Sequence, residues 1–220
     1  MARRYRFNGA GILPDCEWSN HGAVASGALG HDVRVFRKPA RSSTRDVPKF
    51  VDTTLTTIAG PWDLTFQADR GAPPKITLAK LTSWSDNADE GIKYFSGTGI
   101  YTTTIQAPGD WFKPGARLAI DLGEVKNLAE VSVNGKALGV FWKTPYRIDV
   151  TNVLKPGANA VEIKVTNPWV NRIIGDRQPN VTKTYTFTSP KYYKADSKLV
   201  PSGLLGPVQI VQSTAAAAGN

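Results

Sequence analysis

Apolar and polar residues alternate along most of the chain after residue 55, and this alternation predicts β-strands. Seven short runs show it most clearly: residues 62–66, 101–105, 117–122, 129–133, 147–150, 160–165 and 208–211. Valine, isoleucine, threonine and aromatic residues dominate these runs, and a period of two with such residues is typical of strands that bury one face. The pattern therefore predicts many short strands.

Turn-forming residues separate the predicted strands. Asn134-Gly135 is the strongest two-residue hairpin signal, because a type I′ turn needs positive φ at both central positions. Pro114-Gly115 and Pro156-Gly157 each place proline at the first central position of a turn. No segment has a convincing amphipathic helical period. Short strands joined by turns favour an all-β fold, an antiparallel β-sandwich or jelly roll, over a parallel sheet covered by helices.

The first 50 residues lack this regular pattern. Residues 33–38 alternate and are compatible with one strand, whereas residues 40–48 are rich in serine, arginine and threonine and are typical of a linker. We therefore expect three parts: a poorly patterned N-terminal segment at 1–50, a β-sandwich at 51–212 and a disordered tail at 213–220.

Composition and charge narrow the classes of partner. The chain has 220 residues and a net charge of +9, but residues 1–50 hold nine Lys/Arg against four Asp/Glu, which leaves only +4 for the rest. A nucleic-acid-binding surface needs a clustered basic stripe, and the predicted sandwich shows none, so nucleic acid is not expected as a partner. The single cysteine, Cys16, excludes an internal disulfide framework and a cysteine-based metal cluster.

No apolar run approaches the roughly 20 residues of a membrane-spanning helix, so no membrane association is expected. The N-terminus places polar and acidic residues where a signal peptide would need an apolar block. The compartment is therefore unknown from the sequence. It would be periplasmic or extracellular if the chain is part of an exported hydrolase.

A dense group of polar and aromatic residues directly follows the strongest predicted strand. Amide groups both donate and accept hydrogen bonds, as sugar hydroxyls do, and arginine adds a planar fork of donors, so sugar contact is one interpretation. The alternative is structural: Arg172 would pair with Asp176, and asparagine side chains would cap an irregular loop. The candidate ligand-binding residues in this stretch are Asn167, Trp169, Asn171, Arg172 and Asp176.

Trp142 and Tyr146 are the aromatic candidates for the same site. Both lie beside lysine, threonine and proline at a predicted strand end. An exposed ring there would offer a rigid face to the axial C–H groups of a pyranose. The alternative is that each ring plugs one end of the sandwich core.

The acidic loop at residues 85–91 is the remaining chemical candidate. Its carboxylates are compatible with a structural calcium ion, but their spacing matches no known calcium loop, and a solvated acidic turn is the simpler interpretation. Asp89 and Glu90 are adjacent in sequence, and adjacent residues rarely face one another across a substrate as general acid and base. No catalytic pair, metal-ligand motif or cofactor-binding motif is visible, so no catalytic residue, metal ligand or cofactor is predicted.

Six blocks of sequence, taken in order, resemble one known family. They are residues 60–66, 91–101, 121–135, 142–146, 167–176 and 201–207. Together they resemble the C-terminal β-sandwich of bacterial α-L-rhamnosidases of glycoside hydrolase family 106. They are similar, more distantly, to the sugar-binding jelly roll of family 2 glycosidases. The resemblance covers roughly residues 58–211, and residues 33–39 resemble the last strand of the domain that precedes this module.

The resemblance implies a galactose-binding-like β-sandwich that serves a glycoside hydrolase as an accessory module. The catalytic carboxylates of the family lie in an upstream barrel domain that these 220 residues do not contain. The expected partners are therefore a rhamnose-containing or related glycan and the catalytic domain of the same polypeptide. Two alternatives stay open: a purely structural domain docked on the barrel, or an autonomous glycosidase that uses acids of the 85–91 loop.

Overall fold

The computed structural model describes residues 50–189 and 192–215, together with four short strands before residue 50. The chain divides into two compact units, Met1–Val51 with Thr214–Asn220, and Asp52–Ser213. In the first unit β1 (Arg3–Arg6) pairs with β4 (Thr44–Val47), and β2 (Val24–Ser26) pairs with β3 (Asp32–Arg34), both antiparallel.

Two of the described N-terminal strands overlap segments for which the sequence made predictions. The expected strand at residues 33–38 overlaps β3, and its residues 35–38 lie outside the described part of the chain. The expected linker at 40–48 overlaps the short strand β4. Its partner β1 lies far away in the sequence, and local composition therefore gives no sign of the pairing.

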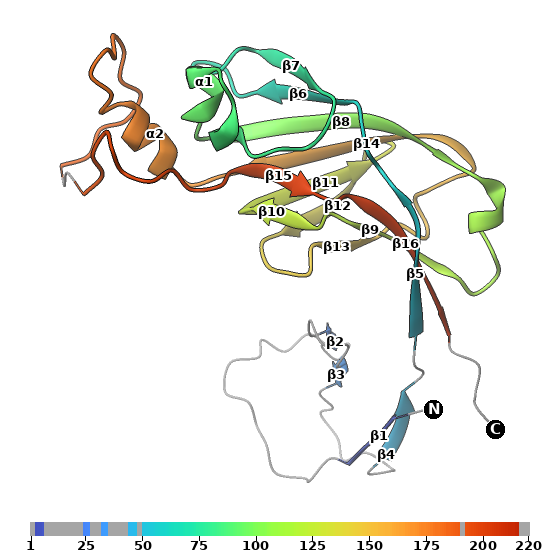
Figure 1. Ribbon diagram of the computed structural model, residues 1–220. Coiled ribbons are helices and arrows are strands. Elements are labelled where there is room, and N and C mark those ends of the chain that lie inside the picture. Colours follow the sequence, from blue (N-terminus) through green and yellow to red (C-terminus); the bar gives the residue numbers. More distant parts are fainter. Residues whose placement is uncertain are drawn as a thin grey trace. The chain divides into compact units, whose positions relative to one another are not determined.

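The second unit is an antiparallel β-sandwich, as the alternation predicted (Figure 1). One sheet has six strands in the order β12-β11-β14-β8-β6-β7, another has four in the order β13-β9-β16-β5, and β10 pairs with β15. The strand bounds are β5 Phe50–Thr57, β6 Trp62–Phe66, β7 Lys75–Leu78, β8 Thr98–Ala107, β9 Arg117–Asp121, β10 Glu124–Lys126, β11 Leu128–Val133, β12 Lys136–Phe141, β13 Arg147–Asp149, β14 Gly157–Thr166, β15 Gly203–Gly206 and β16 Gln209–Ala215.

The hydrophobic core is formed by one face of most strands of the sandwich. In β6, Trp62, Leu64 and Phe66 are buried while Thr65 between them is exposed, which is the period of two read from the sequence. Trp84 and Tyr101 stack at the centre with ring centroids 6.2 Å apart and planes inclined by 11°. Burying large side chains of this kind contributes roughly 1.5–3 kcal/mol each, so this core is the main source of stability.

The Asn134-Gly135 hairpin forms as predicted. The two residues have φ of 52° and 77°, and they connect β11 to β12 with Val133 opposite Lys136. The Asn134 amide also donates to Oδ1 of Asn159 at 2.9 Å, which ties the turn to the start of β14. The hairpin marks one end of the six-stranded sheet.

The opposite end of that sheet carries the predicted site. Strands β12 and β14 both pair antiparallel with β11, so they run in the same direction and finish at the same end. The register places Phe141 opposite Ala129, and Ala129 opposite Val165. Trp142 and Asn167 therefore follow strands that end at the same level on either side of β11, about two strand spacings or roughly 10 Å apart.

Four short helices interrupt the described strands. They are η1 (Trp84–Asp86), α1 (Glu90–Lys93), η2 (Gly109–Trp111) and α2 (Val170–Gly175). The helix α2 begins shortly after β14, in the stretch that the sequence predicted as an irregular loop. No helix in the described part of the chain combines the length and the apolar character needed to cross a membrane.

Candidate functional site

The two asparagines of the predicted site are buried and hold backbone segments. Asn167 accepts a hydrogen bond from the Gly97 backbone N–H and donates to the Phe95 carbonyl, both at 2.9 Å. Asn171, fully buried, donates to the Val200 carbonyl at 2.8 Å and accepts from the Val200 N–H at 2.9 Å. Each side-chain amide thus pairs with the backbone of a neighbouring segment, as an adjacent strand would. The donor and the acceptor of the amide are both used inside the protein.

Arg172 and Asp176 form a buried ion pair, which is the structural alternative considered for them. Arg172 Nε lies 2.9 Å from Oδ1 of Asp176, and their side chains are only 7% and 5% exposed. The other carboxylate oxygen of Asp176 accepts from the backbone N–H groups of Tyr185 and Thr186 at 2.9 and 2.7 Å. The pair therefore fixes the segment that follows α2 to the helix.

The aromatic candidates differ in exposure. Tyr146 is buried, and its hydroxyl donates to the Asn127 carbonyl at 2.7 Å, so it anchors the loop after β12. Trp142 is 70% exposed and Trp169 is 42% exposed. Among the seven predicted residues these two rings present a large surface to solvent at the end of the sheet.

Three segments that are distant in sequence come together through the β6–β7 loop, which contacts Trp169 through Arg70 and Tyr185 through Gly71. The guanidinium carbon of Arg70 lies 4.6 Å from the centre of the Trp169 ring, and Nζ of Lys183 lies 5.0 Å from the Tyr185 ring. Gly71 packs closely against Tyr185: a Cβ added to this glycine would lie 3.2 Å from the Tyr185 ring. We call the four side chains of Arg70, Trp169, Lys183 and Tyr185 the α2 surface.

Sequence reasoning missed three members of the α2 surface. Arg70 lies in the β6–β7 loop, and Lys183 and Tyr185 lie in the segment after α2. The only local signal was the i, i+2 spacing of lysine and tyrosine in that segment, which places both on one side of an extended chain. The contacts of Arg70 with Trp169 and of Gly71 with Tyr185 are tertiary, and the sequence pattern does not contain them.

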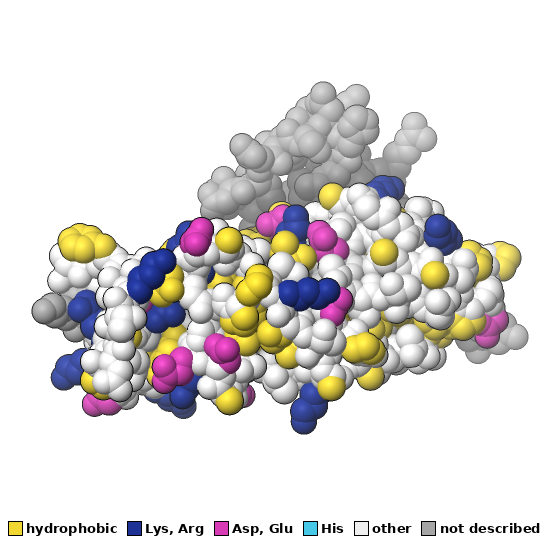
Figure 2. Space-filling view, turned by 90° about the horizontal axis from the view of Figure 1, so that it is seen from above, with side chains coloured by type: hydrophobic (Ala, Val, Ile, Leu, Met, Phe, Trp, Pro, Cys, Tyr) yellow, Lys and Arg dark blue, Asp and Glu magenta, His cyan; other side chains and the backbone are white. Residues whose placement is uncertain are grey.

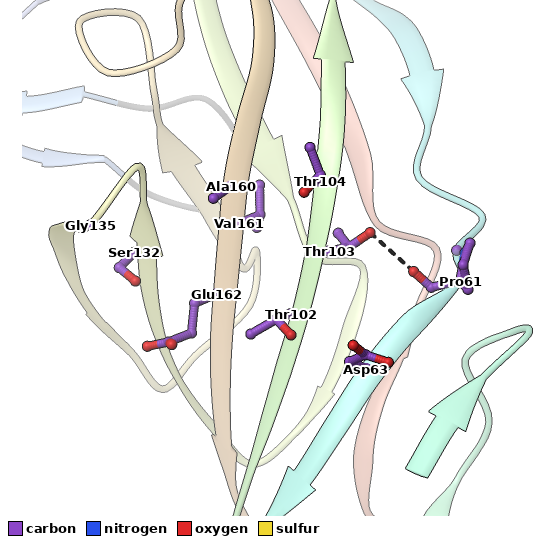
Figure 3. A pocket seen from close by; sticks show the side chains of 11 residues that line it. Pro61, Asp63, Thr102, Thr103, Thr104, Ser132, Gly135, Ala160, Val161 and Glu162 are labelled. Atoms are coloured by element: carbon purple, nitrogen blue, oxygen red, sulfur yellow. Dashed lines mark hydrogen bonds between the residues drawn. The ribbon is translucent and has the colours of Figure 1, made fainter. Parts of the chain in front are cut away.

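A hollow lies on the outer face of the six-stranded sheet, apart from the α2 surface (Figure 3). It has a volume of about 690 Å³ and is lined by residues of β6, β8, β11 and β14 and of the adjoining loops. The strand register aligns Ser132, Glu162, Thr102 and Asp63 in one row across four strands. Figure 3 shows that the lining side chains are small or oxygen-bearing, without an aromatic ring to stack on a sugar.

The two carboxylates that line this hollow, Asp63 and Glu162, are poorly suited to catalysis. Asp63 accepts hydrogen bonds from Lys75 and from the Thr77 hydroxyl, both at 2.8 Å. These hydrogen bonds lower the pKa of Asp63, and the one from Lys75 has the larger effect. Glu162 has Lys164 at 3.7 Å. A general acid in glycoside hydrolysis needs a raised pKa, and Asp63 is shifted in the opposite direction.

The acidic loop at 85–91 has a structural use. Asp89 is the N-cap of α1, where its carboxylate accepts from the Ile92 N–H at 3.2 Å, and the Asn87 side chain accepts from the Asp89 N–H at 2.9 Å. Over residues 50–189 and 192–215, no three His, Cys, Asp or Glu side chains come close enough together to hold a metal ion.

The fold and sequence place the chain in a known family. Residues 83–197 match the family described as glycosyl hydrolase 2 galactose-binding domain-like, and the chain belongs to this family. It is a glycoside hydrolase-related, galactose-binding-like domain with glycosidase homologues.

Individual relatives are large proteins. The structure of a rhamnosidase from Novosphingobium sp. PP1Y is 42% identical, with a TM-score of 0.76 over 81% of this chain and 17% of that one. A Formosa agariphila protein named "Putative beta-glucuronidase" is 40% identical over 176 residues, covering 70% of this chain and 15% of that one. A Ruminococcus gnavus beta-glucuronidase, 18% identical with a TM-score of 0.52 over 75% of this chain and 29% of that one, shares the fold. The chain therefore spans less than a third of each relative.

Proposed function

We propose that the chain is a non-catalytic carbohydrate-binding module of a family 106 α-L-rhamnosidase. In this proposal the module follows the catalytic domain in the same polypeptide and contacts a rhamnose-containing glycan. Six sequence blocks in order and 42% identity to the Novosphingobium rhamnosidase support the family 106 assignment. The sugar would be held at the sheet end that carries α2, either as a separate binding site or as one wall of the catalytic cleft.

The exposed Trp169 ring is the observation that carries the proposal. Its neighbours Asn167 and Asn171 are buried and hydrogen-bonded to backbone, so they fix the position of the indole without covering it. A rigid, exposed indole loses little conformational entropy on contact with a ligand and offers an apolar face to sugar C–H groups. Trp142 supplies a second exposed ring at the same sheet end.

The proposal divides the predicted residues into two groups. Trp169 and Trp142 contact the sugar. The others position them, because their polar groups are engaged inside the protein; they are Asn167, Asn171, Arg172, Asp176 and Tyr146. A shallow site of this kind desolvates little of a sugar, so binding is expected to be weak, with Kd on the order of 1–10 mM.

Titration of the 220-residue chain with methyl α-L-rhamnoside and rhamnose oligosaccharides, followed by NMR, tests the proposal. The indole N–H signals of Trp169 and Trp142 should move, whereas those of the buried Trp62 and Trp84 should not. Trp169→Ala should abolish the shifts, and Phe187→Ala, which removes a ring that is 96% exposed, serves as the matched control. Indole signals that stay fixed throughout the titration would rule out binding by the isolated chain.

A structural role is the second candidate, and a different observation favours it. Phe187 and Tyr192 are 96% and 85% exposed on the segment after α2, and large exposed rings are typical of surfaces that contact another domain. If docking is the main function, Phe187→Ser and Tyr192→Ser in the full-length enzyme should lower its thermal stability. Trp169→Ala should then leave turnover unchanged.

A further inference from the structure

The α2 surface combines an exposed ring, Trp169, and a half-buried ring, Tyr185, with two positive charges that have no acidic partner among the described residues. Figure 2 shows acidic and basic side chains interspersed over one face of the molecule. No described carboxylate forms an ion pair with Arg70 or Lys183. Asp176, which accepts from the Tyr185 backbone N–H, is engaged by Arg172. Both cations instead lie against aromatic rings, at 4.6 and 5.0 Å from the ring centres.

This arrangement suits a ligand that has both an apolar face and a negative charge. The exposed part of the Trp169 ring can contact sugar C–H groups. The Arg70 guanidinium that lies over this ring, or the Lys183 ammonium over the Tyr185 ring, can form a charge-assisted hydrogen bond with a carboxylate or sulfate. A neutral sugar would use the ring and leave the charges of Arg70 and Lys183 unmatched. We propose that the α2 surface prefers an anionic sugar, bearing a carboxylate or a sulfate ester, to its neutral counterpart. This inference rests on the proposed sugar-binding function.

A nucleic acid also combines rings with negative charge, but the chain favours a sugar. Single-stranded nucleic acids bind along grooves in which many cations follow the backbone and successive rings stack on bases. Outside residues 1–50 the chain carries only +4, and the α2 surface offers two rings. Two rings and two cations match one or two sugar residues better than an extended nucleic-acid strand.

Affinity ratios for matched sugar pairs test the inference on the 220-residue chain. One pair is a rhamnosyl-glucuronate disaccharide and its neutral rhamnosyl-glucose counterpart; the other is galactose 6-sulfate and galactose, which separates carboxylate from sulfate recognition. The charged member of at least one pair should bind roughly three- to tenfold more tightly at low ionic strength. The preference should shrink as salt is added, because Lys183 is exposed to solvent and Arg70 is only half-buried.

Two single substitutions assign the preference to its residues. Arg70→Gln and Lys183→Gln should each lower the charged-to-neutral affinity ratio. Lys136→Gln, which removes an exposed lysine at the Asn134-Gly135 hairpin at the opposite end of the sheet, should leave the ratio unchanged. Arg70 lies over the Trp169 ring, so replacing it could also shift that ring. Lys183 lies over the Tyr185 ring instead, so a lowered ratio in Lys183→Gln cannot be explained in this way.

The outcomes separate this inference from the function on which it rests. Equal affinities within both pairs, with binding lost in Trp169→Ala, would overturn the anionic preference and leave sugar binding in place. Absence of binding by any of the four sugars would overturn both. Tighter binding of a single-stranded oligonucleotide, with the same dependence on Arg70 and Lys183, would overturn the preference in favour of a nucleic-acid ligand.

Discussion

The Asp176 carboxylate accepts hydrogen bonds from both the backbone N–H and the side-chain hydroxyl of Thr186, each at 2.7 Å. The same carboxylate pairs with Arg172 on the other side. One buried acid therefore joins the helix α2 to the segment that carries Lys183 and Tyr185. This connection holds the segment that carries two residues of the α2 surface against the helix.

Replacing Asp176 by asparagine should destabilise the domain and release this segment. The variant leaves Arg172 buried without a counter-charge, and breaking a buried ion pair by removing one partner costs about 3–5 kcal/mol. Urea unfolding should show the loss of stability, and trypsin should cleave faster after Lys183. Asp196→Asn, which changes an exposed acid on the same segment, is the control. Unchanged cleavage at Lys183 in the Asp176 variant would contradict the proposed connection.

Alternation along the chain was sufficient to predict the sandwich, because most of its strands bury only one face. It identified β6, β8 and β14, whose buried and exposed residues alternate, and the turn residues located the hairpin after β11. Strand β12 was missed: it is an edge strand with little burial, and Gly139 interrupts its pattern. Secondary structure was therefore predictable where burial imposes a period.

The candidate site was predictable only in part. The sequence shows which side chains can bind a sugar, but not which of them are already engaged. Asn171 pairs with Val200, and Asn167 pairs with Gly97 and Phe95, which are partners remote in sequence. Such two-way pairing depends on tertiary contacts, and an amide in a loop carries no local sign of it.

Removing the Asn171 amide should lower stability by about 1–3 kcal/mol. Asn171→Ala leaves the N–H and the carbonyl of Val200 without their partners in a largely buried place, and an unsatisfied buried polar group costs energy of this order. The free energy of unfolding, measured with urea, should be lower than that of the Asn180→Ala variant, which changes an exposed asparagine shortly after α2. A loss no larger than that of Asn180→Ala would show that the pairing contributes little.

The pair of Asp52 and Arg147 should make part of the stability depend on acid pH. The hydrogen bond from Arg147 at 2.6 Å, assisted by one from Ser213 and opposed by burial, lowers the pKa of Asp52. A lowered pKa in the folded state stabilises the protein above the unfolded value of about 3.9, and this contribution disappears as the pH falls through the folded pKa.

Asp52→Asn should therefore weaken the loss of stability below pH of about 4. The effect should be no more than about 1 kcal/mol, because the pair is partly exposed and screened by water. Urea unfolding at a series of pH values measures it, with Asp196→Asn as the control. Parallel pH profiles for the wild type and Asp52→Asn would contradict the assignment.

Tyr101 should give the opposite dependence, at alkaline pH. Burial raises its pKa above the ordinary value of 10, although the Leu204 N–H donates to its hydroxyl at 3.0 Å. Above pH of about 10 the unfolded chain loses this proton while the folded chain keeps it, so stability should fall by about 1.4 kcal/mol per pH unit from this group. Tyr101→Phe should remove that slope, at a cost of about 1–2 kcal/mol at neutral pH for the unpaired Leu204 N–H. Tyr192→Phe, at an 85% exposed site, should keep the slope, and a Tyr101→Phe profile that still falls like the wild type would show that other groups cause it.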